Sequence, residues 1–285
     1  MHRYTITRFR FSPLLVLCIV LAIGVISGCA DTPSPSDKNA PTQSSSKPDD
    51  FSLLFRDDFD SFDTERWKLM THSWGGNLVL FAAETVDVSS GLLSISLKQA
   101  PEGTRFEGEK KPYLGAEVRS IASINYGRVS ARAKLASGSA VVSALVTLYT
   151  PWPADNWNEL DIESLGKNNN EIQFNAMVYT GPKISSSPSQ SVAPTQHPSL
   201  QTLDFDSSDD FHVYTIEWTP EEALFLIDDI VYHRWTDRMK LMGLPQNILL
   251  TLWVSSAVEW AGAVTEDTIN AKVVYDWVEV WRFTP

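Results

Sequence analysis

Three carboxylates alternate with apolar residues in the segment Glu159-Leu160-Asp161-Ile162-Glu163, a pattern typical of a β-strand. Successive side chains of a strand point to opposite faces, so the three acids share one face while Leu160 and Ile162 can enter a core. Like charges on one face repel each other. Two carboxyls whose pKa values are pushed apart can, however, divide the work of acid and nucleophile. We interpret this face as a reaction site; the alternative is a solvent-facing strand with an acidic outer face.

Strands must position these acids, because period-two runs separated by turn residues fill the chain from Phe51 onward. Strands are predicted at 92–98, 117–122, 126–134, 139–149, 159–165, 171–180, 211–219, 223–227, 230–235, 247–255 and 272–283. No segment shows the periodicity of an α-helix over the length of a helix. The sequence therefore predicts an all-β fold, a two-sheet antiparallel β-sandwich or jelly roll.

One Ser/Pro-rich stretch, residues 182–202, interrupts the strands. Structureless loops of this length are uncommon in compact domains and are often functional. A harmless surface insertion is the equally open alternative. Trp218, Trp277 and Trp281 lie in alternating strands and are predicted to be core residues.

The N-terminal residues are predicted to be a targeting segment. Arg3, Arg8 and Arg10 precede an apolar run, residues 14–26, that is too short to span a bilayer comfortably. The run ends in Ile26-Ser27-Gly28-Cys29, which resembles the lipobox of bacterial lipoproteins. The resemblance implies cleavage of a signal peptide, residues 1–28, and lipidation of Cys29; an ordinary signal peptide is the alternative.

Residues 29–50 form a predicted tether, rich in Ser and Pro and without apolar periodicity. As a flexible coil, it would reach about 25 Å on average. We expect the domain, residues 51–285, to be exported and lipid-anchored to the cell envelope, at the outer membrane or cell surface. The membrane contact would be through the N-terminal lipid alone.

The composition and charge of the chain limit the kinds of partner that it can bind. The chain has a formal net charge of −12, and removal of the signal segment leaves 20 basic against 35 acidic residues. Such a surface repels nucleic acid and anionic polymers, so a neutral partner fits better. The ten tryptophans suit sugar rings as well as cores. Loss of Cys18 with the signal and use of Cys29 by the lipid leave no cysteine for a disulfide or a metal.

Several motifs together resemble glycoside hydrolase family 16, and most closely its bacterial lichenase-like β-glucanases. The central match runs from Trp157 through the three acids to Lys167, and Gln173-Phe174-Asn175 follows it. Further matches are Gly115-Ala116-Glu117-Val118-Arg119-Ser120, Tyr126-Gly127-Arg128, Glu217-Trp218-Thr219-Pro220, Leu252-Trp253, Trp260 and Tyr275-Asp276-Trp277-Val278. The resemblance implies a concanavalin-like β-jelly roll.

The resemblance also implies roles for the acids. Glu159 would be the nucleophile, Glu163 the general acid/base, and Asp161 the carboxylate between them that tunes protonation. The implied reaction is hydrolysis of internal bonds in β-1,3-1,4- or β-1,3-glucan by double displacement with retained configuration. Retention needs the two reactive carboxyls about 5–5.5 Å apart.

Other matching positions imply a sugar-binding cleft, formed by Asn77, Glu117, Arg119, Trp157, Gln173, Asn175, Trp253 and Trp260. Glu117 and Arg119 could instead be a surface ion pair. Relatives often carry a structural calcium, which the resemblance would place near Asp276, although no ligand cluster is visible in the sequence. No other cofactor is needed, and we expect a monomer.

Departures from the family pattern leave the linkage open. Asn158 stands where many relatives have Asp, and Met177 and Thr251 stand where lichenases often have Tyr and Asn. Alternative functions are glucan transglycosylation, carbohydrate binding without turnover, and hydrolysis of an agar- or carrageenan-type galactan. The acid motif, which has a single residue on each side of Asp161, and the negative net charge of the chain disfavour galactan hydrolysis.

Overall fold

The computed structural model of the chain describes residues 42–43, 50–150, 156–180 and 195–284. The strands are β1 (Thr42–Gln43), β2 (Phe51–Asp57), β3 (Trp67–Leu69), β4 (Val79–Phe81), β5 (Val86–Ser89), β6 (Leu92–Ser96), β7 (Lys98–Gln99), β8 (Arg105–Phe106), β9 (Glu109–Lys110), β10 (Tyr113–Ile124), β11 (Gly127–Lys134), β12 (Val141–Tyr149), β13 (Asn156–Leu165), β14 (Glu171–Thr180), β15 (Thr195–Gln196), β16 (Ser199–Thr202), β17 (His212–Trp218), β18 (Ala223–Ile227), β19 (Ile230–Trp235), β20 (Gln246–Val254) and β21 (Lys272–Phe283). The helical pieces are the 3₁₀ turns η2 (Ala83–Thr85), η3 (Met239–Leu241) and η4 (Glu266–Asn270), and the helix α1 (Val258–Ala261).

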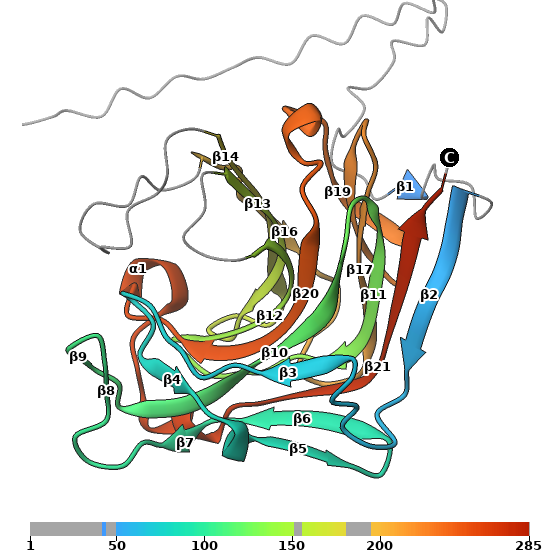
Figure 1. Cartoon of the computed structure of the whole chain (residues 1–285). Coiled ribbons are helices and arrows are strands. Elements are labelled where there is room, and N and C mark those ends of the chain that lie inside the picture. Colours follow the sequence, from blue (N-terminus) through green and yellow to red (C-terminus); the bar gives the residue numbers. More distant parts are fainter. Residues whose placement is uncertain (1–41, 44–49, 151–155, 181–194, 285) are drawn as a thin grey trace, which may run out of the picture. The chain divides into compact units, whose positions relative to one another are not determined.

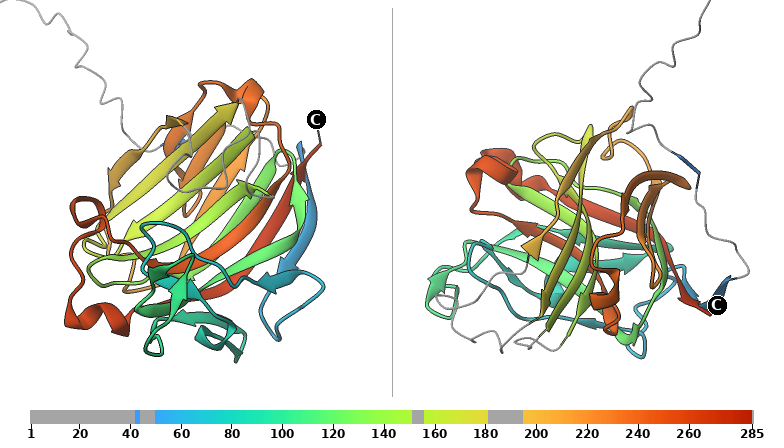
Figure 2. Two further views of the ribbon diagram at one scale, coloured as in Figure 1. Left: turned by 60° about the vertical axis from the view of Figure 1, so that its left-hand side comes forward. Right: turned by 90° about the horizontal axis from the view of Figure 1, so that it is seen from above.

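Two large sheets dominate the structure. The front sheet has the order β15-β14-β13-β12-β20-β10-β3, with β16 added on β14 and with β4 and β7 added on β10. The back sheet has the order β1-β19-β18-β17-β11-β21-β6-β5, with β2 on β21. Figures 1 and 2 show them as curved layers, and the pairing is antiparallel except between β4 and β10. This is the predicted all-β, two-sheet jelly roll.

Alternate side chains of the strands point inward and form the hydrophobic core between the two sheets. On β13, Leu160 and Ile162 are 0% and 1% exposed and belong to the main hydrophobic cluster. Facing strands of the back sheet contribute Ile216, Trp218 and Val280, all fully buried. The acids of β13 must therefore lie on the other face of the front sheet, away from this core.

Two sequence-based expectations need correction. Trp218 is a core residue as predicted, but Trp277 and Trp281 are half-buried on the outer face of the back sheet. A register shift between β11 and β21 at Arg132 precedes them, and Val278 and Val280 take the inward positions. Part of the predicted loop is also ordered, because β15 and β16 pair with the edge strand β14; residues 182–194 lie outside the described residues.

The predicted signal peptide and Cys29 lie outside the described residues. So does most of the predicted tether, although its residues Thr42–Gln43 pair with the edge strand β19. Among the described residues, no helix has the length and apolar character needed to cross a membrane.

Candidate active site

The front sheet brings Glu159, Asp161 and Glu163 together on one face of β13. Across the neighbouring strand β14, Met177, Asn175 and Gln173 stand opposite them in register. On the other side, β12 places Leu148, Val146 and Ala144 opposite them. Ala144 and Val146 form a small buried apolar cluster with Leu249 of β20. The acids thus stand beside an apolar floor, where a charge is poorly solvated.

Glu159 is held by the indole of its neighbour on the same face. Trp157 Nε1 donates a hydrogen bond of 2.6 Å to Glu159 Oε2. Burial raises the pKa of Glu159, the Trp157 bond opposes this rise, and the charges of Glu163 and Glu117 add to it. The indole donor favours the ionised carboxylate of Glu159, which is the form that a nucleophile needs.

Asp161 is the least solvated of the three. Neither of its carboxyl oxygens has an N–H or hydroxyl partner among the described residues. Burial raises the pKa of Asp161 well above its usual range, and the charges of Glu159 and Glu163 raise it further. Its hydrogen bond with Glu159 requires a proton on one of the two carboxyls. Since Glu159 has an indole donor and Asp161 has none, the proton belongs on Asp161.

Glu163 begins a short chain of polar contacts. Gln173 Nε2 donates to Glu163 Oε2 at 2.9 Å, and Trp260 Nε1 donates to Gln173 Oε1 at 3.0 Å. Burial raises the pKa of Glu163 to about 7, while the Gln173 bond lowers it. A carboxyl that keeps its proton to near neutrality can serve as a general acid.

Glu117 and Arg119 of β10 lie across the same face. Arg119 Nη2 is 2.5 Å from Glu117 Oε1, and the Glu117 side chain is only 3% exposed. His72 lies 3.2 Å from Glu117 through its Nε2 atom. The register from β10 through β20 and β12 places Glu117 in line with Glu163 of β13, so this ion pair lies on the same face as the three acids.

Aromatic residues border the acids at both ends of β13. Trp157 stands at the Glu159 end. Beyond Glu163, Trp253 and Trp260 lie with ring centroids 5.8 Å apart. Trp253 also contacts Trp74, at 5.2 Å between centroids, and Trp74 is 39% exposed. Sequence reasoning missed Trp74 because it sits in a loop without periodicity; its place three residues before Asn77 was the available signal.

The two predicted asparagines are buried and partly satisfied. Asn77 Oδ1 accepts a bond from Val79 N at 2.8 Å, while its Nδ2 has no acceptor among the described residues. Asn175 Oδ1 accepts from His197 N at 3.0 Å. His197 belongs to the part of the predicted loop that the structure describes, so this segment fixes the orientation of Asn175.

The calcium expected near Asp276 does not fit the residues there. Asp276 Oδ2 is 2.5 Å from Arg132 Nη1, and the guanidinium carbon of Arg132 lies 4.7 Å from the centre of the Phe211 ring. A cation at Asp276 would have to displace this guanidinium. In the described ranges, no group of three or more His, Cys, Asp and Glu residues is placed to hold a metal ion.

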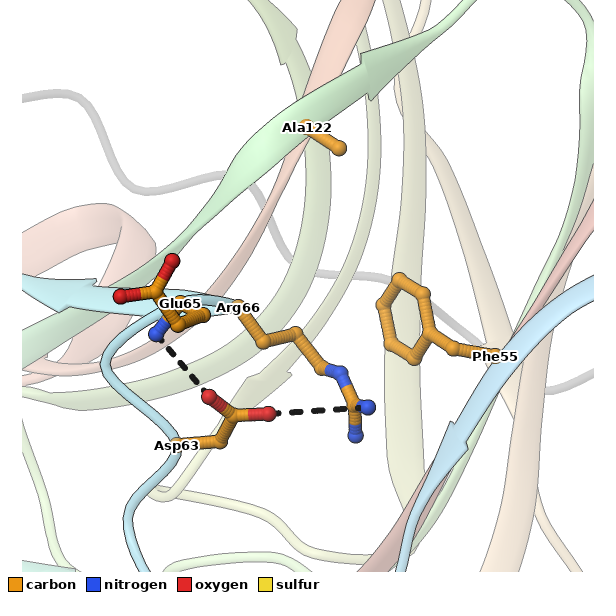
Figure 3. Close-up of a pocket in the computed structure, with 5 residues that line it drawn as sticks. All are labelled: Phe55, Asp63, Glu65, Arg66 and Ala122. Atoms are coloured by element: carbon orange, nitrogen blue, oxygen red, sulfur yellow. Dashed lines mark hydrogen bonds and ion pairs between the residues drawn. The ribbon is translucent and has the colours of Figure 1, made fainter.

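A hollow elsewhere on the surface is lined by Phe55, Asp63, Glu65, Arg66 and Ala122 (Figure 3). Its cation is already neutralised, because Arg66 contacts Asp57 at 3.0 Å and Asp63 at 3.6 Å. None of the predicted site residues lines it. The hollow is therefore separate from the carboxylate site, and its arginine is already paired with two aspartates.

Comparisons with known proteins agree with this geometry. The family described as "Glycosyl hydrolases family 16" matches residues 76–279. Among curated relatives, a "Beta-glucanase" from Brevibacillus brevis is 28% identical over 238 residues, covering 81% of this chain and 82% of the relative. A "Beta-glucanase" from Bacillus subtilis (strain 168) is 27% identical over 229 residues, covering 79% and 84%.

Solved structures give the same result. A β-1,3-1,4-glucanase (lichenase) from a mouse hindgut metagenome superimposes with a TM-score of 0.67 at 29% identity, covering 80% of this chain and 98% of that one. The β-glucanase of Bacillus licheniformis superimposes with a TM-score of 0.65 at 25% identity, covering 79% and 96%.

Proposed function

The chain belongs to glycosyl hydrolase family 16, and from this premise we propose that it is a retaining endo-β-glucanase that cleaves internal bonds of β-1,3-1,4- or β-1,3-glucan. The relatives and solved structures named above are β-glucanases and a lichenase, which supports glucan as the substrate class. The observation that carries the proposal is the row of Glu159, Asp161 and Glu163 beside an apolar floor, with raised pKa values and different hydrogen-bond donors.

The roles follow from the donors. Glu159, held by Trp157 and by the proton on Asp161, attacks the anomeric carbon of a bound glucosyl unit. Glu163, protonated below about pH 7, gives its proton to the departing glycosidic oxygen. Glu163 then acts as a base toward water, which attacks the glycosyl-enzyme at the anomeric carbon and frees Glu159. Each step moves a proton or a bond between named groups, and no further reactant is needed.

The surrounding residues bind sugar. Trp157, Trp253 and Trp260 offer flat faces to sugar rings. Gln173, Asn175, Asn77 and the pair Glu117–Arg119 offer hydrogen-bonding groups to hydroxyls. The partner is accordingly a neutral polysaccharide, and nucleic acid is not a partner.

Export and anchoring are part of the proposal. The signal segment 1–28 and the lipobox at Cys29 support a lipoprotein whose domain, residues 51–285, is held at the cell envelope by a lipid. Radiolabelled palmitate should enter the full-length protein, and Cys29→Ser should abolish labelling. Labelling that survives Cys29→Ser would contradict the assignment.

Product analysis tests the activity. The domain should be incubated with barley mixed-linkage glucan, laminarin, xyloglucan, agarose and carrageenan, and the released oligosaccharides should be separated. We expect a defined ladder from mixed-linkage glucan or laminarin. Products from a galactan alone, or none from any polymer, would contradict the proposal. In a second incubation with a short glucan oligosaccharide added as acceptor, products longer than that oligosaccharide would instead favour transglycosylation.

A further inference from the structure

The loop between β3 and β4 adds a surface to the site that the catalytic acids do not use. It carries Trp74, whose ring contacts Trp253 at 5.2 Å, and Trp253 in turn contacts Trp260 at 5.8 Å. Trp260 is bonded to Gln173, and Gln173 is bonded to Glu163. A continuous row of three tryptophans therefore leads away from Glu163. We refer to Trp260, Trp253 and Trp74 as the tryptophan row.

Trp74 is the exposed end of this row. Its side chain keeps 39% of its surface in contact with solvent, although a large indole would gain free energy from burial. Two other aromatic rings hold it from behind, since Phe81 lies 5.5 Å and His72 lies 6.1 Å from it between centroids. An exposed indole that is braced by other rings is a rigid surface on which a sugar ring can stack.

A buried lysine fixes the loop in this position. Lys111 has a side chain that is 1% exposed, and its ammonium has three acceptors for its three N–H groups. Lys111 Nζ donates to Trp74 O at 2.9 Å, to Asn77 O at 2.7 Å and to Glu109 Oε2 at 3.0 Å. Two of the acceptors are the ends of one turn, because Asn77 N also donates to Trp74 O at 3.2 Å.

Burying an ammonium costs desolvation free energy unless each of its N–H groups has an acceptor. A buried lysine is therefore an unusual residue to find beneath a surface turn. An apolar residue could fill the same space but could not bind two backbone carbonyls at once. The same turn leaves Asn77 Nδ2 buried without an acceptor among the described residues.

We propose that Lys111 is a positioning residue that holds Trp74 beside Trp253, and that Trp74 binds glucan rings beyond the bond that is cleaved. This inference rests on the proposed function and deepens it. Lys111 acts on substrate through Trp74 and touches neither the acids nor the sugar. The row therefore sets affinity for long chains and leaves the chemical step to Glu159 and Glu163.

The test is a double-mutant cycle on purified protein of the full chain, with KM and kcat measured on the glucan that the wild type cleaves. Trp74→Ala should raise KM about tenfold and change kcat less than about twofold, as expected for loss of uniform binding. Lys111→Met should raise KM by a similar factor. In the double variant, the increase should not exceed that of the larger single variant, because both changes remove the same surface.

The neighbouring exposed lysine supplies a matched control. Lys110→Met removes the same charge from the adjacent position, and its KM should equal that of the wild type. Thermal melts establish that each variant is folded. If Lys111→Met does not fold, Lys111→Gln keeps one amide that can bond to a turn carbonyl, and its KM should lie between the wild type and Trp74→Ala.

The outcomes separate this inference from the proposed function. An active wild type with unaltered KM in Trp74→Ala would overturn the inference and leave the function intact. KM increases that multiply in the double variant would show that Lys111 acts elsewhere than on Trp74. A wild type that releases nothing from any glucan would overturn the proposed function and this inference with it.

Discussion

Acidic side chains line strands on both outer faces of the sandwich, but their partners differ. On the back sheet, Glu217 contacts Arg128 at 3.0 Å, Asp276 contacts Arg132 at 2.5 Å and Glu279 contacts Arg56 at 2.6 Å. On the front sheet, Glu117 of β10 also has an arginine partner, Arg119, whereas Glu159 and Glu163 of β13 receive bonds from an indole and an amide. Asp161 receives none from an N–H or hydroxyl group of the described residues.

This contrast separates two uses of a carboxylate. An arginine partner fixes the negative charge and lets an acid such as Glu217 be buried as part of the scaffold. Without a cation, burial favours the neutral form, so Asp161 and Glu163 keep their protons toward neutral pH. Groups that hold and release a proton near the working pH can catalyse, whereas permanently ionised groups hold structure.

The largest effect is expected at Glu159. Glu159→Gln keeps the shape and the Trp157 contact but removes the attacking oxygen, so kcat should fall on the order of 10⁴-fold or more. Binding of polysaccharide should persist, and affinity electrophoresis in glucan-containing gels measures it. Substantial turnover in this variant would exclude Glu159 as nucleophile.

The next effect concerns stability on the back sheet. Arg128→Met leaves the Glu217 carboxylate, 2% exposed, without its cation. Removing one partner of a buried pair typically costs about 3–5 kcal/mol of unfolding free energy. Urea denaturation should show this loss, while kcat at a temperature where the variant is folded should stay near the wild-type value. A stable variant with impaired kcat would reverse the assignment of the two faces.

Ionisation of Glu163 should lower the free energy of unfolding at high pH. The pKa of Glu163 rises from 4.5 to about 7 on folding, so its favourable contribution to folding is present below about pH 4.5 and is lost as pH rises through about 7. Glu163→Gln, which cannot ionise, should therefore be more stable than the wild type at pH 8, by about 3 kcal/mol. At pH 4 the two proteins should be similar. A variant less stable than the wild type at pH 8 would contradict a raised pKa.

A smaller effect is expected at Gln173. Its bond lowers the pKa of Glu163, so the alkaline limb of kcat/KM, expected at about pH 7, should move to higher pH in Gln173→Leu. The shift should be up to about one pH unit. The pH profile of kcat/KM measures it, with Asn170→Leu, an exposed position on the connection before β14, as control. A limb that stays in place or moves to lower pH would contradict the role of Gln173.

The smallest effect concerns calcium. Because Arg132 already occupies the carboxylate of Asp276, EDTA and millimolar calcium should give the same melting temperature. Scanning calorimetry in both buffers measures this. A melting temperature that rises with calcium concentration would show a cation site that the Arg132–Asp276 pair does not describe.

Much of this arrangement could be predicted from the sequence, because strands impose a strict period. Alternation placed Glu159, Asp161 and Glu163 on one face, and the observed β13 agrees. Alternation alone could not predict that Trp277 and Trp281 lie on the outer face, because the sequence pattern does not reveal the register shift at Arg132. Trp74 and Lys111 were missed because their contacts join a loop to a distant hairpin through backbone carbonyls.

The central claim is that the carboxyls without cations on β13 carry out retaining glucan hydrolysis, and the configuration of the first product tests it most directly. The domain should be mixed with barley mixed-linkage glucan or laminarin, and the anomeric protons of the released reducing ends should be followed by NMR before mutarotation. The β-anomer should appear first, and the α-anomer should accumulate later. Initial release of the α-anomer, or no reducing ends at all, would contradict it.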